Sequence, residues 1–145
     1  MARVHDVAAY IISKSRPIDA MKLQKLLYYS QAWSLVWDKQ PLFASKIEAW
    51  ANGPVIRDVF KTYQGQYKIS VSKTGDKSAL KPSEKGTIDA VLDFYGKKDA
   101  FWLSELTHRE TPWMEARKGI APGDYGNVEI TKASMRDYYG GLIGA

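Results

Sequence analysis

The longest regular pattern of apolar positions runs from Asp19 to Trp37 and predicts one long helix. At 3.6 residues per turn, two sets of apolar side chains gather on nearly opposite sides of it. One set is Leu23, Leu26, Leu27, Trp33 and Trp37, and the other is Met21, Tyr28, Ala32 and Leu35. Only narrow polar strips separate them, Lys22 with Lys25 and Gln24 with Gln31. A helix that is apolar on two sides lies between covering layers, so we expect this helix at the centre of the domain.

Shorter amphipathic patterns on either side of this stretch predict further helices, each opened by a capping residue or a proline. The expected starts are Asp6, Asp19, Asn52-Gly53-Pro54, Ser83, Asp99, Thr111-Pro112 and Thr131, and Gly140-Gly141 is expected to end the last helix. Trp102 and Leu103 are expected to point inward from the helix that follows Asp99. The pattern therefore predicts a mainly α protein.

Two stretches have a different period and predict a minor β element. Leu42–Trp50 is too short for a second long helix and alternates in part, so we expect it to be extended. Apolar and polar residues also alternate through Tyr67–Val71, which we expect to pair with the region of Ile47 as a two-stranded ribbon. The polar stretch Lys73–Lys81 is expected to be a mobile loop. No repeat or linker interrupts the chain, so we expect one compact domain over residues 1–145.

Composition narrows the class of protein. The chain is 45% hydrophobic and 26% charged, as in soluble globular proteins, and it contains no cysteine. We see no signal peptide and no apolar run of about 18 residues that would span a membrane, so we expect a cytoplasmic protein. The net charge of +5 is scattered, with its densest cluster in Lys68–Lys85. Such a charge permits an acidic protein partner or a nucleic acid.

The usual catalytic patterns are missing from the sequence. His5 and His108 have no metal-ligand spacing, and no glycine-rich phosphate loop or nucleophile elbow is present. Ser104, Glu105 and His108 lie within one helical turn, which is typical of a solvated helix face. We therefore expect no catalytic residue, no metal and no cofactor, and the residues favour an interaction module over an enzyme.

Four segments together resemble one known family. They are KLQKLLYYSQAW (Lys22–Trp33), IEAWANGPVIRDVF (Ile47–Phe60), LSELTHRETPWMEAR (Leu103–Arg117) and ITKASMRDYY (Ile130–Tyr139). In this order and spacing they resemble the Panacea domain, a family that includes SocA-like antitoxins and phage-associated GepA-like proteins. The resemblance implies an antitoxin that neutralises a co-encoded toxin by direct protein–protein binding. One branch of the family is similar to a protease adaptor, which would add a cytosolic protease to the partners.

The resemblance also carries over signature residues in two groups. The expected structural group is Leu23, Leu27, Tyr28, Trp33, Trp50, Gly53, Pro54, Thr107, Pro112 and Trp113. The polar group, which we take as candidate functional or partner-binding residues, is Lys22, Gln24, Lys25, Asn52, His108 and Arg117. A core does not need these polar side chains. Two interpretations remain open: a buried hydrogen-bond network around the central helix, or the lining of a shared pocket.

Two other functions compete with the antitoxin interpretation. In the first, the basic region Lys68–Lys85 binds nucleic acid beside the helix expected from Val55, although no Arg- and Asn-rich recognition helix accompanies it. In the second, His108 acts with Glu105 or Glu110 in a hydrolase. We expect a cognate protein toxin as the partner, and we expect neither a membrane nor a nucleic acid.

Overall fold

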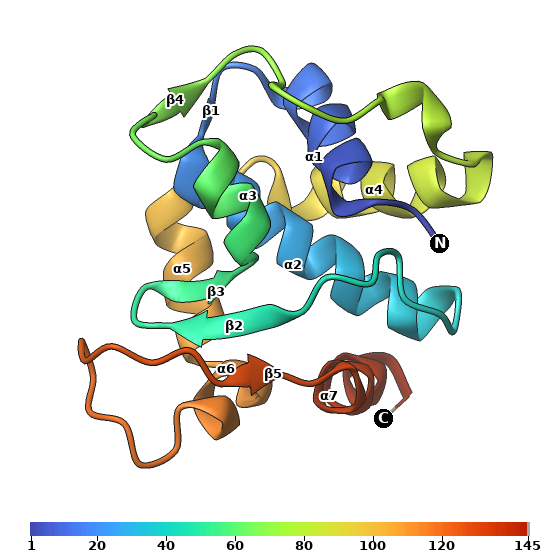
Figure 1. The fold of residues 1–145 in the computed structure, drawn as a ribbon. Coiled ribbons are helices and arrows are strands. Elements are labelled where there is room, and N and C mark those ends of the chain that lie inside the picture. The colour runs from blue at the N-terminus through green and yellow to red at the C-terminus, as the bar shows by residue number, and fades with distance from the viewer. Residues whose placement is uncertain (145) are drawn as a thin grey trace.

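The computed structural model describes residues 1–144 and confirms a mainly α chain with small β elements (Figure 1). The helices are α1 (Val4–Ser15), α2 (Ala20–Trp37), α3 (Arg57–Thr62), α4 (Pro82–Tyr95), α5 (Ala100–His108), α6 (Thr111–Ala116) and α7 (Lys132–Gly144), with a 3-10 turn η1 (Lys77–Ala79). The strands are β1 (Ile18–Asp19), β2 (Ile47–Trp50), β3 (Gly53–Val55), β4 (Lys68–Ile69) and β5 (Glu129–Ile130).

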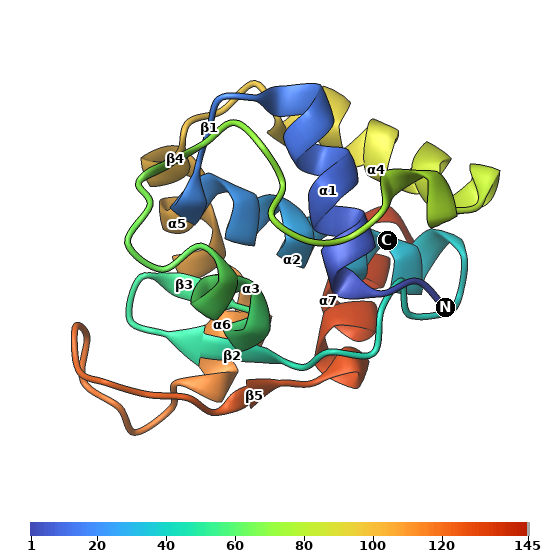
Figure 2. The same ribbon diagram turned by 45° about the horizontal axis from the view of Figure 1, so that its top comes forward.

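Helix α2 is the central element, as its two apolar sides predict. Every residue from Leu23 to Leu35 is buried. Figures 1 and 2 show α2 running through the middle of the molecule, with α1 and α4 on one side and α7 on another. Helix α5 and strand β3 cover its N-terminal half. The expected burial is wrong at the helix ends, where Met21 is 39% exposed and Trp37 is 44% exposed.

The polar residues Gln24, Lys25 and Gln31 of α2 are also buried, whereas Lys22 is half-buried, and the two glutamines hold the backbone of the covering segments. Gln31 accepts a hydrogen bond from the Leu42 amide at 2.7 Å and donates one to the Phe43 carbonyl at 2.9 Å. Gln24 does the same at Ile56, accepting from its amide at 2.8 Å and donating to its carbonyl at 3.2 Å. Buried polar groups need such partners. Each glutamine therefore fixes a chain segment that lies outside the named helices and strands.

The three-stranded sheet places β2 between β3 and β5, both antiparallel to it. Trp50 pairs with Gly53 across a two-residue turn, so the expected helix start at Asn52-Gly53-Pro54 is wrong. Ala51 and Asn52 form the turn and Gly53 begins β3, so this motif lies in a hairpin. Gly53 has φ +123°, which favours glycine, and Pro54 lies on the edge strand β3, where a missing amide donor is tolerated. The helix begins only at Arg57.

The second sheet pairs β1 with β4, with Ile18 opposite Ile69. The expected pairing of this strand with Ile47 is therefore wrong, and Ile47 instead pairs with Ile130 of β5. The Lys68 ammonium lies 2.9 Å from the Asp19 carboxylate and helps to set the observed register. Such long-range partners depend on which strands the helices bring together, which local alternation does not determine.

The helix caps follow the sequence in part. Asp99 accepts from the Trp102 amide and Thr131 accepts from the Ser134 amide, as expected. Asp19 occupies the expected N-cap position of α2, but its side chain makes no capping hydrogen bond there. The expected inward position of Trp102 is wrong, because its side chain is exposed at the surface of α5.

Three further expected helix boundaries are wrong. Asp6 lies inside α1, and its carboxylate accepts a hydrogen bond from the Asp76 amide at 2.8 Å. It therefore holds the polar stretch Lys73–Lys81 against α1 instead of capping the helix. Helix α4 begins at Pro82, so its N-cap is Lys81 and not Ser83. The Glu84 carboxylate accepts a hydrogen bond from the Lys81 amide. Gly140-Gly141 does not end α7, which continues to Gly144, since glycine in a helix interior costs only about 1 kcal/mol relative to alanine.

Candidate functional site

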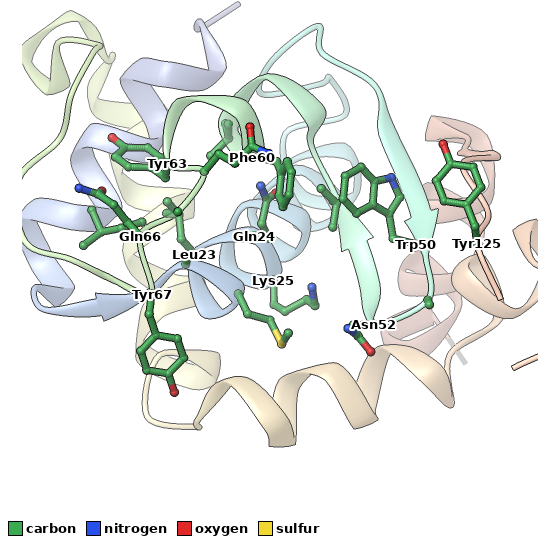
Figure 3. A pocket seen from close by; sticks show the side chains of 18 of the residues that line it. Leu23, Gln24, Lys25, Trp50, Asn52, Phe60, Tyr63, Gln66, Tyr67 and Tyr125 are labelled. Carbon is green, nitrogen blue, oxygen red and sulfur yellow. The ribbon is translucent and has the colours of Figure 1, made fainter. Parts of the chain in front are cut away.

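A pocket of about 520 Å³ opens beside the N-terminal half of α2 (Figure 3). Its walls come from α2, the β2–β3 hairpin, α3, the segment 64–69 and the loop 123–126. The lining residues used below are Leu23, Gln24, Lys25, Trp50, Asn52, Phe60, Tyr63, Tyr67 and Tyr125. Among the described residues that line it, Lys25 is the one charged side chain. The pocket is therefore mostly apolar, with a few polar groups at its base.

Aromatic side chains form the wall and rim of this pocket. Tyr63 is buried, whereas Phe60 is 40% exposed, Tyr67 is 76% exposed and Tyr125 is 74% exposed. Trp50 and Phe60 meet edge to face with ring centroids 4.9 Å apart, and Figure 3 shows both rings among the side chains that line the pocket. Exposed aromatic groups gathered around a hollow are typical of interaction surfaces.

Lys25 lies at the base of the pocket with 1% of its surface exposed. Its Nζ donates one hydrogen bond, to the Pro54 carbonyl at 3.2 Å. No carboxylate within residues 1–144 lies at ion-pair distance from it. Burial lowers the pKa of this amine to about 7, because a charge without a counter-ion is poorly solvated there.

A second group of side chains holds the hairpin from behind. The Arg117 guanidinium donates to the Ala49 carbonyl at 3.1 Å and to the Asp124 carbonyl at 2.7 Å, which joins β2 to the loop before β5. The Trp113 indole donates to the Trp50 carbonyl at 2.9 Å. The His108 ring stacks on Trp113 at 4.0 Å. These contacts fix the wall of the pocket without entering it.

The structure therefore divides the polar signature residues. Gln24, Lys25 and Asn52 line the pocket, and Gln24 and Lys25 also belong to the buried network around α2. His108 and Arg117 lie behind the hairpin. Lys22 is separate from both groups, and its Nζ donates to the Gly96 carbonyl at 2.7 Å.

The candidate catalytic groups do not assemble. The Ser104 hydroxyl donates to the Asn52 carbonyl, so it is not oriented by His108. Burial lowers the pKa of His108, and the Glu105 carboxylate lies 3.8 Å from its Nδ1. Glu110 is bonded to tyrosine hydroxyls in a separate buried cluster. The arrangement around His108 is that of a packed ring beside a surface carboxylate.

The pocket also contains aromatic residues that sequence reasoning did not select. Phe60 and Tyr63 lie in α3 and directly after it, and Tyr67 begins the alternating stretch that predicts a strand. Tyr125 lies in a glycine-rich loop without any periodic signal. These residues become a site only when α3, the segment before β4 and the loop before β5 meet around the hairpin. The one available signal was the frequency of aromatic residues near turns.

A sequence model of the family described as Antitoxin SocA-like, Panacea domain, matches residues 23–114. This match covers more than half of the chain, and the chain belongs to that family. It includes the buried part of α2, the hairpin, α3 and most of the pocket. No curated protein matches the chain, and no solved structure matches it. None of the helices in residues 1–144 is long and apolar enough to cross a membrane.

Proposed function

We propose that this protein is the antitoxin of a toxin–antitoxin pair, acting in the cytoplasm as a non-catalytic binding protein. It neutralises a co-encoded protein toxin by contacting it directly, and residues 1–145 act as a single domain in doing so. Membership of the SocA-like antitoxin family supports the class of function. The observation that supports direct binding is the open pocket with an aromatic rim, where Tyr67 and Tyr125 are exposed. Tyrosine and tryptophan are favoured anchors at protein interfaces.

Delivery of the bound toxin to a cytosolic protease is an extension of the same proposal. It adds a second partner but leaves the toxin contact unchanged. In a protease-deficient host, an adaptor would allow the toxin to accumulate, whereas an antitoxin that simply blocks its toxin would protect equally well in both hosts.

Co-expression with the neighbouring reading frame tests the proposal. We expect the neighbouring product to arrest growth when induced alone, and growth to recover when this protein is induced with it. The two proteins should also co-purify. If the neighbour is harmless alone, or stays toxic beside this protein at equal expression, the proposal fails.

A further inference from the structure

We infer that the pocket binds a segment of the toxin that presents an apolar side chain next to a carboxylate. The apolar group lies against the aromatic wall formed by Trp50, Phe60 and Tyr63, and the carboxylate pairs with the Lys25 ammonium. This inference rests on the proposed function and names the chemistry of the recognised segment.

The apolar half of the inference follows from the shape and lining of the pocket. Its volume of about 520 Å³ accommodates a large side chain together with part of its backbone. The inner wall is buried and apolar, at Leu23, Val59 and Tyr63, while the rim is exposed. An apolar side chain that enters such a hollow loses most of its contact with water, and residues of this kind contribute most to interface affinity.

The charged half follows from what Lys25 lacks. An ammonium has three donors, and the described chain supplies one acceptor, the Pro54 carbonyl. The neighbouring Gln24 amide is paired at both atoms with Ile56, and no hydrogen bond joins it to Lys25 within the described chain. A buried charge without a counter-ion is costly, so a carboxylate brought by the partner supplies the missing charge and the missing hydrogen bonds.

The other ionisable groups around Lys25 make an anion the complementary ligand. The positive charges of Lys25 and Arg117, which follows α6, both act to lower the pKa of His108 of α5, although burial is the larger cause, so these three basic groups lie in one electropositive region. Two acidic residues on neighbouring elements already have other partners: Glu48 of β2 accepts hydrogen bonds from Trp50 and Arg57, and the Glu105 carboxylate of α5 lies 3.8 Å from His108. No acidic residue lines the described pocket. The site therefore attracts a negatively charged group, and its described lining contains no such group.

Proton uptake on binding distinguishes a lysine that pairs with a toxin carboxylate from one that only stabilises the fold. In the free protein the pKa of Lys25 is about 7, so part of the population is uncharged at neutral pH. A bound carboxylate favours the charged form, and the amine must then take up a proton on binding. Affinity should fall as pH rises above 7. His108, whose pKa is lowered by burial, stays neutral in that range.

The experiment is calorimetric titration of this protein with the purified product of the neighbouring reading frame, below and above pH 7, in two buffers of different ionisation enthalpy. The wild type should take up a proton and bind more weakly at the higher pH. Lys25→Met should lower affinity at least about tenfold at the lower pH and abolish the uptake. Lys22→Met is the matched control, because Lys22 lies on the same helix and donates to a carbonyl away from the pocket. It should bind like the wild type.

Rim variants test the apolar half without disturbing the core. Tyr67→Ala and Tyr125→Ala should each weaken binding several-fold, whereas Phe101→Ala, equally exposed on α5 but outside the pocket, should not. The variants Tyr67→Ala and Tyr125→Ala also test whether the toxin binds in this pocket if Lys25→Met does not fold. If the toxin binds the wild type but all pocket variants bind equally well, the toxin docks elsewhere; the inference is overturned and the proposed function stands. If the wild type binds no toxin, both fail.

Discussion

At the scale of single residues, Glu110 shows how much of the core depends on one carboxylate. Its Oε1 accepts hydrogen bonds from the Tyr29 and Tyr139 hydroxyls, each at 2.7 Å, and so joins α2 to α7. Glu110→Ala should destabilise the fold by about 2–5 kcal/mol, because two buried hydroxyls lose their acceptor. Glu115→Ala, on the exposed side of α6, should change stability by less than about 0.5 kcal/mol. Urea denaturation of both variants measures this difference, and equal stabilities would contradict it.

The same residue gives the core a predictable dependence on pH. Burial raises the pKa of Glu110 above its usual value of 4.5, although its tyrosine hydrogen bonds oppose the shift. The folded state therefore binds this proton more tightly than the unfolded state does. As a result, the contribution of Glu110 to the free energy of unfolding falls as pH rises from 4.5 through the raised pKa. Glu110→Gln cannot ionise. Its stability relative to the wild type should increase over that interval and then level off. Denaturation curves at several pH values would show a flat difference if the carboxylate did not titrate this way.

At the scale of elements, the β2–β3 hairpin is fixed by the close approach of Lys25 to Gly53. A Cβ at Gly53 would lie 2.6 Å from the Lys25 Cε, and φ there is +123°. Gly53→Ala should therefore destabilise the protein by about 1–3 kcal/mol through backbone strain and displacement of the lysine. Gly65→Ala is the matched control, because its φ of +88° is also positive but its Cβ would meet nothing within 4 Å. Thermal denaturation should show the larger loss for Gly53→Ala.

Elements with local signals could be predicted, and elements fixed by distant partners could not. The two-sided pattern of α2 and the caps at Asp99 and Thr131 are local, and all three are found in the structure. The motif Asn52-Gly53-Pro54 matches a local helix-start pattern, but pairing of Gly53 with Trp50 of β2 places it in a hairpin instead. In the candidate site, Gln24 and Lys25 stood out because they interrupt an apolar helix. Tyr125 did not, since only the folded chain brings its loop beside the hairpin.

At the scale of the whole molecule, the core extends beyond the segment that matches the family. Residues 23–114 include most of α2 and the hairpin but omit α1, β1, β5 and α7. Met135 and Tyr139 of α7 are buried against the central helix, and the Tyr139 hydroxyl bonds to both Tyr28 and Glu110. Ile130 of β5 pairs with Ile47. The family segment therefore contains the site but only part of what covers α2.

This arrangement predicts that the family segment does not fold by itself. A chain of residues 23–114 would expose the faces of α2 that α1 and α7 cover. The free energy lost with that apolar burial exceeds the free energy of unfolding of an ordinary domain. We expect it to lack a cooperative thermal transition by circular dichroism, whereas the full chain melts in one step. A chain ending after Gly141 should keep that single transition, because Leu142 and Ile143 are exposed. A cooperative transition in the 23–114 chain would instead show that α1 and α7 are additions to a smaller independent domain.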